Sequence, residues 1–261
     1  MKFILITNRY KLIDIFHNFK SSEIFCEKNS FAQKYCEKKK ISYKTYKTRS
    51  DFHKIILKNL NNKIFTNGCK FLFPKKILSK LKFKAINIHP SLLPNYRGQF
   101  VIDKIFYNRE KYIGATIHEI DNGVDTGKIL HQKKILYKYN NWIIDLYHKL
   151  FLLEKKVFEE YFFKNKKINL KIKKKDIIKI RKKNVFSLKE LNKYPIRFIQ
   201  SQCVPNKYLK IRINSIFKKI LYCEKKKFFN LKKLNKSNYF QLSENDYIIR
   251  CSDCTSRILL I

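Results

Sequence analysis

Glycine is scarce in this chain of 261 residues, and its placement is uneven. Five glycines are present; four of them lie between residues 86 and 131, and the fifth, Gly68, lies shortly before that stretch. Glycine is the residue that permits tight turns and the close approach of the backbone to another group. A chain with so little of it keeps unusual backbone geometry for one region, so residues 86–131 are the first place to look for a functional site.

Long apolar runs are also missing. No segment of about 18 consecutive apolar residues exists, which excludes a membrane-spanning helix. The apolar segment Met1–Ile6 is too short for the core of a signal peptide and is interpreted as a buried first strand. The seven cysteines are scattered and odd in number, so we expect reduced thiols in a cytoplasmic protein. Cys251 and Cys254 form one close pair without a second, and no metal site is predicted.

Acidic residues are few. The chain has 20 Asp and Glu against 59 Lys and Arg, a formal net charge of +39. One interpretation is the composition of an AT-rich genome, which favours Lys, Ile, Asn, Phe and Tyr. The other is a polyanionic partner, because Lys and Arg that neutralise phosphates drive association with nucleic acids. Within residues 86–131 the charges balance, with five basic and five acidic residues, so this stretch does not share the excess of positive charge in the rest of the chain.

The chemistry of the stretch can be derived from two segments. Ile86–His89 alternates apolar and polar residues, so as a strand it places Asn87 and His89 on one face. An amide and an imidazole side by side can hold an acyl oxygen and move a proton, which are the parts that acyl transfer requires. Asp125, in the glycine-rich loop Gly123–Gly127, is a candidate to fix the tautomer and orientation of that imidazole.

At these residues the chain resembles the catalytic domain of formyltransferases that use 10-formyltetrahydrofolate. That family includes methionyl-tRNA formyltransferase, glycinamide ribonucleotide formyltransferase and the amino-sugar formyltransferases of surface-polysaccharide pathways. The matching segments are Asn87–Pro94, Tyr96–Gly98, Gly114–His118 and Asp121–Gly127. Weaker similarity covers roughly the first 165 residues, and the run Asn-x-His-Pro-Ser-Leu-Leu-Pro makes the match highly specific.

The resemblance implies roles for individual residues. Asn87, His89 and Asp125 match the catalytic trio of the family. The expected folate contacts are the loop Ser91, Leu92, Leu93 and Pro94 and the backbone around Gly68. In the implied reaction a primary amine attacks the formyl carbon of 10-formyltetrahydrofolate, without a metal. Asn87 and a protonated His89 stabilise the oxyanion, Asp125 holds His89, and the folate nitrogen leaves with a proton delivered through His89 or a water.

The order of strands and helices predicts an α/β fold. Strand-to-helix units from Phe3 onwards indicate a Rossmann-like, doubly wound, mostly parallel sheet in a catalytic domain of residues 1–165. Helices are predicted at Arg9–Phe19 and Phe31–Lys39, and Asp51 is the expected N-cap of a third helix. The turn after the first strand, Thr7-Asn8-Arg9, lacks the glycines that relatives often carry, so a phosphate-binding turn is not expected there. Residues 166–186 are predicted as a basic linker and residues 187–261 as a small β-rich domain, because short alternating runs replace the helical spacing.

Other histidines are interpreted as structural. His118 is expected to face across the sheet without a catalytic role, and the same interpretation is given to His17, His53, His131 and His148.

The identity of the amine that accepts the formyl group stays open. Methionyl-tRNA is favoured by the basic linker and the basic β-rich domain. A nucleotide-linked amino sugar is favoured by Gln99–Val101, where the tRNA enzymes have small residues and proline, and by the amino-acid sequence of Gly114–Asp121. Glycinamide ribonucleotide is third, because its enzyme usually lacks a C-terminal β domain. A non-catalytic relative that binds tRNA is the alternative from another class.

Overall fold

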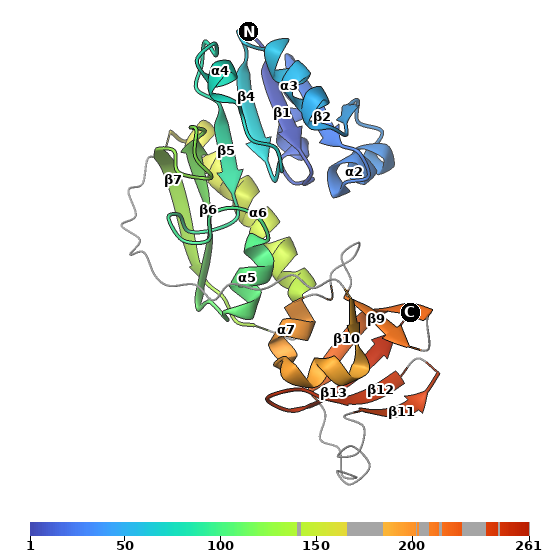
Figure 1. Ribbon diagram of the computed structural model, residues 1–261. Coiled ribbons are helices and arrows are strands. Elements are labelled where there is room, and N and C mark those ends of the chain that lie inside the picture. The colour runs from blue at the N-terminus through green and yellow to red at the C-terminus, as the bar shows by residue number, and fades with distance from the viewer. Residues whose placement is uncertain are drawn as a thin grey trace. The chain divides into compact units, whose positions relative to one another are not determined.

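The computed structural model describes residues 1–139, 142–165, 185–201, 203, 209–213, 216–225, 239–244 and 246–260 (Figure 1). These residues form two compact units. The first contains Met1–Val101, Lys111–Tyr137 and the residues from His148 to 165, and the second contains Ile102–Glu110, Lys138–Tyr147 and the described residues from 185 on. No helix in this part of the chain is both long and apolar enough to span a bilayer.

The first unit is built on a seven-stranded sheet with the order β3-β2-β1-β4-β5-β6-β7. Its strands are β1 (Phe3–Thr7), β2 (Ser22–Glu27), β3 (Lys44–Tyr46), β4 (Lys63–Asn67), β5 (Ile86–His89), β6 (Tyr112–Glu119) and β7 (Ile129–Leu136). Strands β1 to β5 are parallel, whereas β6 and β7 run antiparallel to their neighbours. The prediction of a doubly wound, mostly parallel sheet is therefore confirmed.

Helices complete this unit, and two of them differ from the sequence prediction. They are α1 (Ile13–Phe16), α2 (Phe31–Lys39), α3 (Arg49–Leu57), α4 (Lys75–Leu78) and the part of α6 (Ile143–Phe162) from His148 on. A longer first helix from Arg9 was expected, but the Arg9 carbonyl accepts the Thr7 hydroxyl at 2.8 Å, and the Ile13 N–H donates to the Tyr10 carbonyl instead. Helix α3 is capped by Thr48, while Asp51, the predicted cap, occupies the third position of the capping box.

Helix α6 packs on the sheet through aromatic rings. The ring of Phe158 lies 5.4 Å from that of Phe65 on β4 and 5.3 Å from that of Phe16 on α1. Phe162 continues the contact to Phe3 on β1 at 5.5 Å. Such pairs each contribute about 0.5–1.5 kcal/mol beyond the area they bury. The apolar stripe of this helix therefore fixes the strands β1 and β4, whose C-terminal ends meet where the strand order reverses, the usual ligand position in sheets of this kind.

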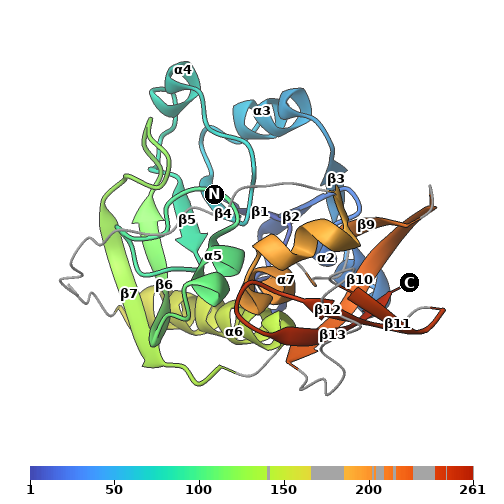
Figure 2. The same ribbon diagram turned by 60° about the horizontal axis from the view of Figure 1, so that its bottom comes forward.

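The second unit contains a six-stranded sheet with the order β11-β12-β13-β10-β9-β8. Its strands are β8 (Val185–Ser187), β9 (Lys210–Ile213), β10 (Ile216–Lys225), β11 (Tyr239–Ser243), β12 (Asp246–Arg250) and β13 (Thr255–Leu260). Its helical elements are η1 (Leu188–Lys193), α7 (Ile196–Ser201) and, apart from its first residue, α5 (Val101–Tyr107). Figure 2 shows α7 beside β10.

The core of the second unit is apolar, with Leu191, Ile211, Ile220 and Ile258 fully buried. Most of the predicted basic linker 166–186 lies outside the described residues, so the boundaries 1–165, 166–186 and 187–261 stay predictions.

Candidate active site

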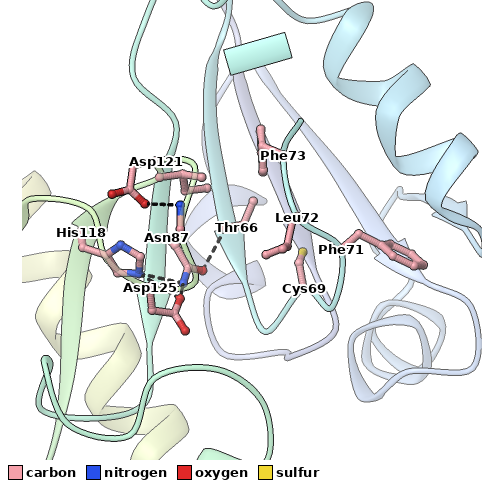
Figure 3. Close-up of a pocket in the computed structure, with 11 residues that line it drawn as sticks. Thr66, Cys69, Phe71, Leu72, Phe73, Asn87, His118, Asp121 and Asp125 are labelled. Atoms are coloured by element: carbon pink, nitrogen blue, oxygen red, sulfur yellow. Dashed lines mark hydrogen bonds and ion pairs between the residues drawn. The ribbon is translucent and has the colours of Figure 1, made fainter. Parts of the chain in front are cut away.

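Three neighbouring strands of the first unit bring polar side chains together. In the sheet register, Asn87 of β5 lies between Thr66 of β4 and His118 of β6. The loop that follows β6 adds Asp125, and Figure 3 shows the four side chains gathered on one wall of a pocket. Residues separated by up to 59 positions in the sequence thus form one polar cluster, because the strand pairing aligns Thr66, Asn87 and His118, and the loop after β6 brings Asp125 to Asn87.

The amide of Asn87 is held on both sides. Its Oδ1 accepts a hydrogen bond from the Thr66 hydroxyl at 2.9 Å. Its Nδ2 lies 3.3 Å from Oδ1 of Asp125 and 3.0 Å from Nε2 of His118. Because a carboxylate can only accept, the nitrogen of the amide must face Asp125 and the oxygen must face Thr66. The amide therefore presents a donor to the interior of the site.

The imidazole of His89 is 5% exposed and lies between two acceptors. Its Nε2 donates to the carbonyl of Tyr96 at 2.8 Å, and its Nδ1 is 3.4 Å from Oδ2 of Asp125. Burial lowers the pKa of His89 to about 4, although Asp125 and the Tyr96 carbonyl favour the charged form. The lowered pKa favours a neutral imidazole at neutral pH, because desolvation outweighs its two acceptors. The protonated His89 that the family resemblance implies for the reaction stays a prediction.

This lowered pKa predicts a pH-dependent stability. Between the ordinary value of about 6.5 and about 4 the unfolded chain binds a proton at His89 that the folded chain does not, so the free energy of unfolding falls as the pH falls through this window. We expect a loss on the order of 2–3 kcal/mol, measured by urea unfolding at several pH values. A His89→Gln variant should show a smaller slope over the same window, whereas equal slopes would contradict the assignment.

The loop that carries Asp125 is fixed by its own side chains. Asp125 has a φ of +52°, a left-handed conformation in which Asp and Asn are tolerated. Oδ1 of Asp121 accepts the backbone N–H of Gly123 at 3.0 Å and the hydroxyl of Thr126 at 2.6 Å, which closes the loop. The backbone N–H of Gly98 donates to Oδ2 of Asp125 at 2.8 Å.

The charge of Asp125 is favoured in this position. Burial raises the pKa of its carboxyl, but the His118 and His89 imidazoles and the Gly98 N–H outweigh that effect, and the pKa is lowered to about 2. Asp125 is therefore ionised at neutral pH.

A pocket that is open to solvent lies beside this cluster. One wall is polar and contains Asn87, His118 and Asp125. The facing wall is apolar and is made by the segment Phe71–Phe73 together with Cys69, as Figure 3 shows. A pocket with one apolar wall and one hydrogen-bonding wall suits a flat ring next to a reactive polar group.

The predicted folate loop Ser91–Pro94 is ordered by buried side chains. The Thr116 hydroxyl donates to the Ser91 carbonyl at 2.6 Å and accepts the Leu93 N–H at 3.2 Å. Gln132 Nε2 donates to the Leu93 carbonyl at 2.8 Å. A Cβ at Gly114 would lie 2.4 Å from the Leu92 side chain, so this glycine makes room for the loop. None of Ser91, Leu92, Leu93 and Pro94 lines the pocket of the catalytic cluster, and their contact with folate stays a prediction.

The turn after β1 is filled by side chains. The Arg9 guanidinium pairs with the carboxylate of Glu154 on α6 and lies over the Phe151 ring at 5.3 Å. Glu154 is 1% exposed, and burial raises its pKa to about 7 against the opposing effect of Arg9. Gly68 has a φ of +72°, and a Cβ there would meet Asn8 Oδ1 at 2.2 Å. Gly68 is therefore required where β4 ends against this filled turn; its predicted contact with folate is not tested by the contacts around it.

Sequence reasoning missed His118, which was interpreted as structural. It is 2% exposed, it lines the pocket, and it contacts both Asn87 and Asp125. Asn87, His89 and Asp125, which were predicted, do come together.

In the described part of the chain, no three His, Cys, Asp or Glu side chains are grouped so that they could hold a metal ion.

Comparison with known proteins agrees with this geometry. The family described as formyl transferase matches residues 21–161, more than half of the chain. Methionyl-tRNA formyltransferase of Caldicellulosiruptor saccharolyticus is 43% identical over 79 residues, which are 30% of this chain and 25% of that protein. The same enzyme of Thermodesulfovibrio yellowstonii is 50% identical over 64 residues, or 24% of this chain and 21% of that protein. The matched part thus spans about a quarter of the length of these curated relatives.

Solved structures extend the likeness in fold to both units. WlaRD, a sugar 3N-formyl transferase with dTDP and 5-N-formyl-THF, has a TM-score of 0.63 at 22% identity and covers 100% of this chain and 98% of its own. The N-formyltransferase from Helicobacter canadensis, in complex with folinic acid and dTDP-3-aminofucose, has a TM-score of 0.61 at 22% identity, with coverage of 99% and 98%. These identities are low, so the comparison establishes the fold.

Proposed function

The chain belongs to the formyl transferase family, and from that membership we propose that it transfers a formyl group from 10-formyltetrahydrofolate to a primary amine. The observation that carries the proposal is the convergence of Asn87, His89 and Asp125. One oxygen of Asp125 lies 3.4 Å from His89 and the other lies 3.3 Å from Asn87, beside a pocket with an apolar wall. This arrangement supplies an oxyanion donor, an imidazole and a carboxylate at one point.

The residues divide the reaction between them. The amine attacks the formyl carbon, the carbonyl oxygen becomes an oxyanion, and an N–H of Asn87 donates to that oxygen. The bond from the carbon to the folate nitrogen then breaks. The proton that the amine loses reaches the folate nitrogen through His89, or through a water molecule that Asp125 orders. A neutral His89 can accept that proton, and Asp125 stabilises the imidazolium that results.

We assign the formyl donor, 10-formyltetrahydrofolate, to the pocket and the loops around it. The apolar wall Phe71–Phe73 suits the pterin ring, and Gly68 directly precedes Cys69 of the same wall. The Ser91–Pro94 loop contributes further contacts to the folate, as the family resemblance implies.

Methionyl-tRNA is the first candidate acceptor. The curated relatives that carry this activity are 43–50% identical over 64–79 residues of this chain. The net charge of +39 favours a polyanion, because each neutralised phosphate releases counterions.

A nucleotide-linked amino sugar is the second candidate. It is favoured by Gln99–Val101, and by the fact that the fold likeness to the sugar enzymes runs over both units, so a chain of this layout is compatible with a sugar acceptor.

Salt dependence and product identity separate the two candidates. We offer 10-formyltetrahydrofolate with Met-tRNA or with dTDP-linked amino sugars and measure the formylated product at 50 and 200 mM salt. With Met-tRNA, several neutralised phosphates predict that apparent affinity falls at least about tenfold over this range, while an amino-sugar nucleotide changes it little. Formylation of neither acceptor would overturn the proposed function.

A further inference from the structure

His118 lies at the centre of the polar cluster. The register of β5 and β6 places it directly opposite Asn87. Its Nδ1 is 2.7 Å from the carbonyl oxygen of Glu119. A carbonyl can only accept, so Nδ1 carries a proton and donates it. This bond fixes the plane of the ring and leaves Nε2 directed at the site.

The groups around Nε2 all belong to the site. Asn87 Nδ2 is 3.0 Å away and Asp125 Oδ1 is 3.4 Å away, while the His89 ring centroid is 6.3 Å from that of His118. A distance of 3.0 Å is an ordinary hydrogen bond and 3.4 Å is a long one. In its neutral form, Nε2 therefore accepts an N–H of Asn87.

We propose that His118 is a positioning residue for formyl transfer, which holds the Asn87 amide so that its second N–H reaches the formyl oxygen. The inference rests on the proposed function. Three partners set the amide: Thr66 on its oxygen, and His118 and Asp125 on its nitrogen. The contact with Asp125, at 3.3 Å, is the longer of the two on the nitrogen. The formyl oxygen replaces that contact, while the bond to His118 keeps the amide in place.

A purely structural role would depend on a different atom. The bond from Nδ1 to Glu119 ties β6 to its own turn, and an asparagine side chain can reproduce it. Within the described residues, the polar contacts of Nε2 are with Asn87 and Asp125. Two substitutions therefore separate the roles: His118→Asn keeps a polar atom at the position of Nδ1, and His118→Gln keeps one at the position of Nε2.

Steady-state kinetics of these variants tests the proposal with whichever acceptor the wild-type chain formylates. We expect His118→Asn to lower kcat by about 10–100-fold, while KM for 10-formyltetrahydrofolate stays within about threefold of the wild type. Misplacing the Asn87 N–H by about 1 Å lowers the rate by a factor on this order. His118→Gln should recover most of that loss. The matched control is His17→Asn, on an exposed histidine outside the site, which should leave kcat unchanged.

A double-mutant cycle shows whether His118 acts through Asn87. In an Asn87→Ala background, His118→Asn should lower kcat by less than about threefold further, because the amide it holds is absent. Full additivity of the two losses would overturn the proposal, and so would a His118→Asn variant as active as the wild type. A lowered Tm together with equal losses in His118→Asn and His118→Gln would show a structural role instead. A wild-type chain that formylates no acceptor would overturn the proposed function, and this inference with it.

Discussion

Asp125→Asn is expected to lower kcat/KM for formyl transfer by about 10³–10⁴-fold, the order seen when the carboxylate that orients a catalytic imidazole loses its charge. Asp125 faces His89 with one oxygen and Asn87 with the other, and the first oxygen also accepts the Gly98 N–H. An asparagine would direct an NH₂ group at one of these donors. The substitution thus removes the charge that stabilises an imidazolium and turns one hydrogen bond into a clash of donors.

The same substitution leaves the backbone without added strain. Asp125 has a φ of +52°, and asparagine enters the left-handed region as readily as aspartate. An alanine there would add a backbone cost of roughly 1–2 kcal/mol and confuse the result.

Single-turnover formation of tetrahydrofolate, together with thermal unfolding, measures the effect of Asp125→Asn. The control is Glu244→Gln, which makes the same change of charge at a side chain that is 87% exposed. If Asp125→Asn stayed within about tenfold of the wild type, the role given to this carboxylate would be wrong.

Asn87→Ala is expected to lower kcat by about 10²–10³-fold, the usual effect of removing one oxyanion donor. The loss should appear in kcat and in kcat/KM alike, because the bond to the formyl oxygen strengthens only in the transition state. The fold should survive, although the Thr66 hydroxyl and His118 Nε2 each lose Asn87 as a partner, at a cost on the order of 1–3 kcal/mol each.

Kinetics at saturating donor tests the prediction for Asn87, with Asn18→Ala as a control at an exposed asparagine. A rise in KM with unchanged kcat would mean that Asn87 binds the donor without stabilising the transition state.

Much of the first unit could be predicted from the sequence. Strand β5 was expected at Ile86–His89 and lies there, because strict alternation and Pro90 define its ends. Helix α2 was expected at 31–39 and is observed at Phe31–Lys39. Local sequence patterns determine such elements, since a periodic row of buried apolar residues and a residue that ends the element are enough to predict it. Helix α1 was predicted too long, because the Thr7 hydroxyl donates to the Arg9 carbonyl, which the first helical turn would need, and apolar spacing does not show this bond.

The site was predicted in part, for a related reason. Motif spacing identified Asn87, His89 and Asp125. It could not identify His118, because the pairing of Asn87 with His118 depends on the register of two antiparallel strands. Nor could the sequence show that Glu154 on α6 meets Arg9 in the turn after β1, a contact between residues 145 positions apart. Long-range register and helix placement determine these contacts, and a single sequence contains neither directly.

The most direct test of the account is a single-turnover experiment with radiolabelled 10-formyltetrahydrofolate, excess enzyme and each acceptor in turn. For the wild-type chain we predict stoichiometric transfer of label to the amine of one acceptor, and for His89→Gln, Asn87→Ala and Asp125→Asn at least about a hundredfold slower transfer with donor still bound. Transfer by all three variants at the wild-type rate would contradict the claim that these side chains perform the reaction.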